Sequence, residues 1–553
     1  MLDIRIAKFL IFAGPIVSLV ISPFSNYDPI NLIKLVFVCS ISFYCFALFF
    51  CDLKKFISRI SNSIWILFIF FAISLLSPLI FSGAPINQQF WGTFGRNTGF
   101  LTYLSLLMIL ISAATIEKKD FYKSIVNSLV LTSIPMTFYC LLQIAKLDPI
   151  GWSEKHPFGT LGNINFSSAF FGLSTICALA LVTNNVYPKF LRLLILLLVV
   201  IDLMIVASTG SIQGLMMFFA GAGIQGFMYI NKKFKSKVFN GFYILIGVFT
   251  TFLTIFGLSN KGPLSKFLFA PSIVFRTDYW HAGYAMTLKF PLFGVGLDSY
   301  GDWYRTLRGE ISTLRTGPDR IANTAHNIFL DLSSNGGLPL IISYVLILVV
   351  TFRCAINFLK DNSNPHAIAL FTAWIGFIIF SSISIGQIGV GIWGWLFTGT
   401  ILGLQKKSSI SSIDPQNRNT KKRSKKIQKS KLSPGMSLIG FFGFVIGIIL
   451  SLIPFEADVN FKNAMNTRAM DKIISSLNMP GITSFHYEVA LTLAFNNHLT
   501  EQSHEIAQTL VRRYPLNFTG WQAIYISDLS TVEEKRLAIE NLRNLDPYNP
   551  NLK

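Results

Sequence analysis

The chain has 553 residues, of which 52% are hydrophobic and only 13% charged, and its mean hydropathy is +0.53. This composition excludes an ordinary soluble globular protein, in which about a quarter of the residues are charged. The formal net charge of +20 does not indicate nucleic acid as a partner, because the Lys and Arg residues lie mostly in short clusters between apolar runs. The composition therefore predicts an all-α, polytopic membrane protein surrounded by membrane lipid.

Apolar runs that are long enough to cross a membrane as helices recur along the chain. We predict about thirteen spans, which would place the two termini on opposite sides of the membrane. The predicted ranges are 8–22, 32–51, 64–82, 98–115, 125–145, 163–183, 192–208, 212–230, 241–259, 327–351, 366–383, 390–404 and 437–455. The six Cys residues fall within or beside these runs without CxxC spacing, so we interpret them as small apolar residues.

The distribution of basic residues predicts the orientation of the spans. If the N-terminus is cytoplasmic, every second loop between the spans also faces the cytoplasm. Each of these loops is basic, as the positive-inside rule requires. Residues 405–436 are the strongest indication, because they hold ten Lys or Arg residues against Asp414 and are typical of a disordered cytoplasmic linker. Residues 1–404 would then form the main transmembrane domain of an inner (plasma) membrane protein, and residues 437–455 would form its last span.

The polar tail, residues 456–553, is predicted to be extracytoplasmic and helical. The tail contains an approximate repeat, RRYPLNFTGW (512–521) and NLDPYNPNL (544–552), in which Pro515 and Pro547 are 32 residues apart. This spacing is typical of tetratricopeptide helix pairs, and a generic helical bundle is the alternative. In the repeat interpretation, residues 485–497 and 501–514 form one antiparallel pair, and the tail could bind a protein partner.

The longest predicted outer loop, residues 260–326, exceeds what topology requires, and loops of this length are usually functional. It contains five arginines: Arg276, Arg305, Arg308, Arg315 and Arg320. A guanidinium is planar, always charged and suited to phosphate oxygens, so these residues are candidates for holding a diphosphate. The alternative is that they are solvated or paired with acidic residues of the same loop. Those acidic residues are Asp278, Asp298, Asp302 and Asp319.

His326 lies where this loop meets the next span, and it could accept a proton near neutral pH. The alternative is a structural His that caps the helix. The sequence shows no HExxH, no acidic pair at the start of a span, no Walker loop and no GxSxG, so we expect neither a metal nor a cofactor. Asp202, within a very apolar run, is a candidate site residue or a hydrogen-bonded carboxyl between helices.

Two segments around these residues resemble the signature region of the O-antigen ligase and polymerase family. They are RTDYWHAGYAMTLKFPLFGVGLDSY (276–300) and TAHNIFLDLSSNGGLPL (324–340). The matching positions are Arg276, Trp280, Pro291, Gly294, Gly296, His326, Asn327, Leu330 and Gly337. Residues 92–104, which include Arg96, and residues 157–170 and 208–214 resemble other outer-face segments of the family. The chain departs from the family at Gln213, near which an Arg is expected, and at Leu340, which replaces a Gly.

The resemblance implies an inverting, metal-independent glycosyltransferase. The donor would be an undecaprenyl diphosphate-linked glycan, and the acceptor a hydroxyl of a lipid or glycan, in lipid A core ligation or repeat-unit polymerisation. Arg276 would hold the diphosphate and His326 would activate the acceptor. Further candidates for binding the donor are Arg96, Arg305, Arg308, Arg315, Arg320, Asn327 and Gln213. The alternatives are a protein O-oligosaccharyltransferase and a non-enzymatic transporter or flippase of lipid-linked sugars.

Overall fold

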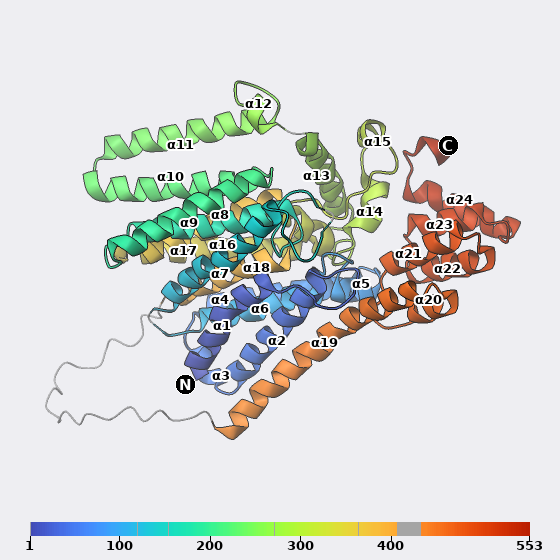
Figure 1. The fold of residues 1–553 in the computed structure, drawn as a ribbon, viewed down its shortest axis with the longest axis horizontal. Coiled ribbons are helices and arrows are strands. Elements are labelled where there is room, and N and C mark those ends of the chain that lie inside the picture. Colours follow the sequence, from blue (N-terminus) through green and yellow to red (C-terminus); the bar gives the residue numbers. More distant parts are fainter. Residues whose placement is uncertain are drawn as a thin grey trace.

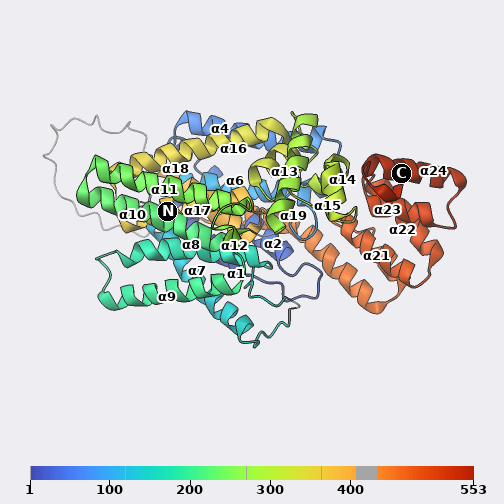
Figure 2. The same ribbon diagram turned by 90° about the horizontal axis from the view of Figure 1, so that it is seen from above.

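The computed structural model describes residues 2–118, 120–152, 154–269, 271–362, 364–405 and 433–552. These residues form helices and no strands, which confirms the predicted all-α class. Long helices run side by side in an elongated bundle, and short C-terminal helices gather at one end of it (Figures 1 and 2). The N-terminus lies at the opposite end of the bundle from these helices (Figure 1).

The bundle helices coincide with all of the predicted spans. They are α1 (Leu2–Leu19), α2 (Asn31–Phe50), α4 (Asn62–Phe81), α6 (Phe100–Ala114), α7 (Phe121–Ile144), α8 (Ile164–Val182), α9 (Lys189–Ser208), α10 (Gln213–Phe234), α11 (Lys237–Leu258), α16 (Ile328–Asp361), α17 (Pro365–Ile383), α18 (Ile388–Gly403) and α19 (Pro434–Thr467). Among the described residues, nine helices are long and apolar enough to cross a membrane, and α6 and α18 are shorter apolar helices. The chain is thus a multi-pass membrane protein.

The outer surface of the bundle is apolar, as a lipid environment requires. Only 6% of the apolar stretch of α11 and 28% of that of α9 are buried within the protein. Large side chains such as Phe249 and Leu193 are therefore left exposed. Because lipid tails are as apolar as these side chains, their exposure has no cost in a membrane.

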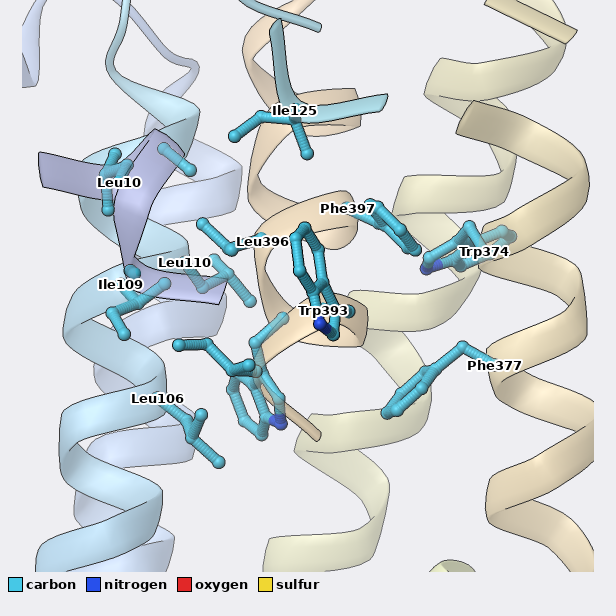
Figure 3. Close-up of a cluster of buried hydrophobic side chains, with 14 of the residues drawn as sticks. Leu10, Leu106, Ile109, Leu110, Ile125, Trp374, Phe377, Trp393, Leu396 and Phe397 are labelled. Atoms are coloured by element: carbon cyan, nitrogen blue, oxygen red, sulfur yellow. The ribbon is translucent and has the colours of Figure 1, made fainter. Parts of the chain in front are cut away.

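The interior of the bundle is closely packed around α18. The indole ring of Trp393 lies among side chains of the neighbouring helices (Figure 3), and its N–H donates to the Ser18 hydroxyl of α1 at 2.9 Å. Trp374 of α17 donates in the same way to the Thr398 hydroxyl of α18 at 3.1 Å. Each buried indole N–H therefore has a partner, which removes the cost of burying it.

The longest seam in the bundle joins α19 to α2. A Cβ at Gly443 would lie 2.6 Å from the Phe43 carbonyl oxygen, and one at Gly447 would lie 2.6 Å from that of Cys39. Small residues at this spacing allow two membrane helices to approach backbone to backbone. α19 continues beyond the predicted end at residue 455 as far as Thr467, so that one helix leads from the bundle into the tail. Most of the predicted linker, residues 406–432, lies outside the described residues.

Shorter helices complete the structure. Within and beside the bundle they are α3 (Leu53–Ile57), α5 (Ile86–Trp91), α12 (Ser265–Leu268), α13 (Pro271–Lys289), α14 (Tyr300–Leu307) and α15 (Glu310–Thr316). In the tail they are α20 (Met470–Ser476), α21 (Ser484–Asn496), α22 (Thr500–Arg513), α23 (Phe518–Ile526), α24 (Val532–Leu545) and a 3-10 turn (Pro550–Leu552). The predicted outer loop is therefore largely helical.

The tail has a core of its own and is anchored to the bundle. Ala490 and Ala494 of α21 share that core with Ile506 and Leu510 of α22, as the predicted helix pair requires; the tetratricopeptide interpretation stays a prediction. The Asp458 carboxylate on α19 accepts the N–H of Asp28, which precedes α2, at 2.9 Å and lies 3.1 Å from the imidazole of His486 on α21. This buried carboxylate links the bundle, α19 and the tail.

Candidate functional site

The segment from α13 to the start of α16 is held by a break in α16. Gly337 adopts φ 77° inside the helix, a conformation that glycine adopts at little cost. The break frees the Ser334 carbonyl, which accepts the N–H of Val295 at 2.8 Å, while the N–H of Leu338 donates to the Pro291 carbonyl at 2.7 Å. The Pro-x-x-Gly-x-Gly turn after α13 thus satisfies backbone groups that the broken helix leaves open.

His326 is fixed immediately before α16. The Asn327 carboxamide oxygen accepts the N–H of Phe329 at 2.9 Å as the N-cap of the helix, so this part of Asn327 is structural. The Asp331 carboxylate accepts the N–H of Ala325 at 2.7 Å. These two contacts flank His326, whose own φ is 54°, and they hold its backbone in the left-handed region.

The imidazole of His326 is not held by hydrogen bonds to the described residues. Its ring lies 5.2 Å from the Tyr279 ring, and neither ring nitrogen has a hydrogen-bond partner among the described residues. Burial, together with the charges of Arg96 and Arg276, lowers the pKa of His326 to about 3. The ring is therefore neutral at physiological pH, which is the form that accepts a proton.

Arg276 lies on α13, one turn before Tyr279, so the two side chains share a face of that helix. Within the described chain its guanidinium makes no hydrogen bond or ion pair. Burial lowers the pKa of Arg276, and Tyr279 opposes this, but a guanidinium stays charged in any case. This cation is half-buried, unpaired and close enough to His326 to act on it electrostatically.

Arg96 reaches the same place from the loop between α5 and α6. Its guanidinium donates to the Asn323 carbonyl at 3.2 Å. Burial lowers its pKa, and the Asp298 and Asp331 carboxylates oppose that effect. The Asp298 carboxylate also accepts the N–H of Thr93 at 2.7 Å and so ties this loop to the segment after α13. We name Arg96, Arg276 and His326 the transfer cluster.

Two other predicted arginines contact the tail instead. The buried Arg308 guanidinium donates to both carboxylate oxygens of Asp546 at 2.8 Å, and neither side chain is exposed. Arg305 donates to the same carboxylate at 3.1 Å and lies over the Phe518 ring at 4.3 Å. We name Arg305, Arg308 and Asp546 the tail clasp. Its arginines serve an internal contact rather than the transfer cluster.

The remaining loop arginines also have partners. Arg315 lies 3.3 Å from the Asp278 carboxylate in a partly exposed ion pair, which is one of the pairings considered from the sequence. The Arg320 guanidinium lies over the Phe275 ring at 3.9 Å. Among the five arginines of the predicted loop, Arg276 and Arg320 therefore have no counter-charge bonded to them within the described chain, and Arg276 is the one of these two whose charge acts on His326.

Two positions in the segments that resemble the family keep buried polar atoms without partners. Gln213, at the start of α10, is 2% exposed, and neither its amide oxygen nor its amide nitrogen has a hydrogen-bond partner in the described residues. The same holds for the indole N–H of Trp280 on α13. Asp202 differs, because its carboxylate accepts hydrogen bonds from the hydroxyls of Thr137 and Ser174, as expected for a carboxyl held between helices.

Several contacts of this site carry no signal in the sequence. Asp331 supports the residue before His326, and Asp546 pairs with arginines some 240 positions earlier. Asp298 had been considered only as a possible partner of arginines within its own loop. Over the residues that the structure describes, no group of three or more His, Cys, Asp or Glu side chains is placed to hold a metal ion.

Comparison with known families matches residues 194–345 to the model described as O-antigen ligase. The matched part contains α13, the tail-clasp arginines and the start of α16, and therefore both Arg276 and His326. Arg96 lies outside it. No curated protein matches the chain. Residues 194–345, the stretch that carries α13 and the start of α16, are therefore similar to an O-antigen ligase domain.

Proposed function

We propose that this protein transfers a glycan from undecaprenyl diphosphate to an acceptor hydroxyl, with inversion and without a metal. The observation that carries the proposal is the transfer cluster, in which an unpaired guanidinium lies beside a neutral imidazole without hydrogen-bond partners. The family match supports an O-antigen ligase or polymerase reaction in general.

In the proposed reaction, the acceptor oxygen attacks the anomeric carbon of the sugar that is linked to diphosphate. The bond from that carbon to the diphosphate oxygen breaks, and its electron pair leaves with undecaprenyl diphosphate. His326 takes the proton of the acceptor hydroxyl and later releases it to water. Attack opposite the leaving group inverts the anomeric configuration.

The positive charges act on the leaving group. Arg276 and Arg96 are placed to bind diphosphate oxygens, and their interaction strengthens as negative charge develops on the leaving oxygen. Burial, with a contribution from the same charges, lowers the pKa of His326 and keeps the imidazole unprotonated before the reaction. The cations would therefore both stabilise the departing diphosphate and maintain the base.

We also propose that the transfer cluster lies on the outer side of the inner membrane, with the N-terminus in the cytoplasm. In support, α13–α15 and the tail gather at one end of the bundle, away from the N-terminus (Figure 1). The basic residues Lys54 and Lys55 of α3, and Lys232 and Lys233 at the end of α10, belong to loops at the opposite end. Their positions agree with the positive-inside rule.

The test is transfer by the purified full chain in detergent, with lipid-linked glycan extracted from the host as donor. We expect His326→Ala to abolish transfer and still to bind the donor, because the cations remain. A matched His366→Ala variant removes a histidine that contacts Asn127 on α7 and Tyr187 in the connection between α8 and α9, and it should retain transfer. Full activity in His326→Ala would refute the proposed base, whereas no transfer by the unmodified protein would favour a transporter.

The acceptor can be identified in a deletion strain. Loss of a ligase leaves lipid A core bare, whereas loss of a polymerase leaves it with a single repeat unit, and the two products separate on a gel. If instead a protein loses its glycan while the lipopolysaccharide ladder is normal, the acceptor is a Ser or Thr of that protein.

A further inference from the structure

A cavity of about 450 Å³ lies beside the transfer cluster. Its walls come from four separate parts of the chain: residues 27–31, 94–96, 152–166 and 385–387. Arg96 lines this cavity and also donates to the carbonyl of Asn323, three residues before His326. Arg96 therefore belongs both to the wall of the cavity and to the transfer cluster.

The wall of this cavity is aromatic on one side, and the aromatic ring there is fixed in position. Trp152 is half-buried in the wall, and its indole N–H donates to the Tyr139 hydroxyl at 2.9 Å. The Phe158 ring meets it edge to face at 5.3 Å. A flat apolar surface is thus held in place, rather than being free to collapse into the cavity.

Amide side chains line other parts of the wall and are also fixed. Asn31 donates to the Gly95 carbonyl at 2.8 Å, and Gln387 donates to the Asn31 amide oxygen at 3.3 Å. Asn163 uses its amide oxygen to cap α8 at the N–H of Asn165. The amide nitrogen of Asn163 has no hydrogen-bond partner in the described part of the chain, so it remains available as a donor.

The cavity also has an acceptor without a partner. Asp28 is 5% exposed, and one of its carboxylate oxygens accepts the N–H groups of Ile30 and Asn31. The other oxygen is buried and has no hydrogen-bond partner among the described residues. A buried acceptor in this state is costly unless a ligand or water donates to it.

We infer that this cavity binds one or two sugar residues of a substrate glycan. A sugar ring presents an apolar C–H face, which suits Trp152, and a rim of hydroxyls, which suits the donor of Asn163 and the acceptor of Asp28. The volume lies within the roughly 300–1,000 Å³ of small-molecule sites. A lipid chain would leave these polar groups unsatisfied.

This inference rests on the proposed function for the source of the sugar, which belongs either to the donor glycan or to a glycan acceptor. Kinetics with the full chain separates the two. We expect Trp152→Ala to raise KM about tenfold for the substrate that supplies the sugar, equivalent to roughly 1.4 kcal/mol of lost binding, and to leave kcat within about twofold. A rise for the donor alone or for the acceptor alone identifies the source.

Three further variants guard against a general loss of structure. Asn163→Asp keeps the oxygen that caps α8 but removes the amide donor, so it should raise the same KM by a smaller factor. Trp521→Ala removes a tryptophan of the tail that contacts the Pro515 carbonyl, and it should leave KM unchanged. Trp152→Phe, which keeps an aromatic face, should restore most of the binding.

Direct binding distinguishes failure of this inference from failure of the proposed function. The probes are lipid-linked glycan extracted from the host and undecaprenyl diphosphate without sugar. Trp152→Ala should bind the first more weakly and the second as the unmodified protein does. Equal weakening of both, or no change in binding and in either KM, would overturn the inference. An unmodified protein that binds the lipid-linked glycan but transfers none of it would overturn the proposed function and leave this binding test valid.

Discussion

The transfer cluster and the tail clasp lie on the same stretch of chain and use the same residue type, but their arginines have opposite surroundings. In the tail clasp, Arg308 is fully buried and bonded to both oxygens of Asp546. In the transfer cluster, Arg276 is half-buried and has no counter-charge bonded to it within the described chain. A paired, buried cation stabilises the fold, whereas an unpaired one keeps its charge for a ligand.

The largest effect is expected from the unpaired cation. Arg276→Ala should lower the rate of transfer by about 100-fold or more, since losing one preorganised donor to a developing negative charge has an effect of this size. Arg276→Lys should recover part of the rate, because it restores the charge without the planar fork. The measurement is the initial rate at saturating donor, with thermal unfolding as a control for the fold. Near-normal activity in Arg276→Ala would remove the distinction between the two groups of arginines.

The tail clasp should respond in stability rather than in chemistry. Arg308→Met leaves the Asp546 carboxylate buried with a weaker partner, and breaking such a pair costs about 3–5 kcal/mol. We expect a lower midpoint of thermal unfolding and faster proteolysis of the tail. The double variant Arg308→Met with Asp546→Leu should recover much of the loss, since it leaves no unpaired charge between these two positions. Equal loss in the single and double variants would contradict a role for the pair itself.

The pH dependence of transfer should show whether the nearby cations help to keep His326 neutral. The pKa of His326 is lowered to about 3, so the imidazole remains neutral well below the ordinary value of about 6.5. kcat/KM should therefore show no loss of activity from His326 as the pH falls through 6.5. Arg96→Gln removes one of the two charges that depress this pKa, so the pKa rises and activity should fall at a higher pH than in the unmodified protein.

That prediction is checked by full pH profiles of kcat/KM for both proteins. Arg315→Gln is the matched control, because Arg315 does not contribute to the lowered pKa of His326. An acid limb at the same pH in Arg96→Gln and in the unmodified protein would show that Arg96 does not act on His326.

The smallest effect is expected at the partly exposed ion pair. Arg315→Ala breaks the contact with Asp278, and ion pairs at the surface contribute about 0–1 kcal/mol. Thermal unfolding should shift little, and the transfer rate should change by less than about twofold. A large loss of activity would place Arg315 with the transfer cluster.

The sequence was most informative about the membrane helices. Each predicted span coincides with a helix, because about twenty consecutive apolar residues are a local property of the chain. The predicted span 437–455 lies within α19, and the polar residues that follow it continue the same helix into the tail.

The site was predicted in part. Arg276 and His326 were identified by their neighbours in the sequence and Arg96 by a separate resemblance, and the structure brings their charges together. Charge and spacing in the sequence did not show that Arg305 and Arg308 pair with Asp546, because Asp546 lies in the tail. Pairing over such a distance depends on tertiary structure, which charge and spacing do not reveal.

The continuous α19 also determines where the tail can be. A helix of 34 residues is about 51 Å long, whereas the hydrocarbon core of a membrane is about 30 Å thick. Roughly 20 Å of α19 must therefore stand beyond the hydrocarbon, and this length sets the height of the tail above it. The tail clasp and the Asp458 contact fit only that height, so inserting one helical turn into α19 would lift the tail away from the segment that carries the transfer cluster.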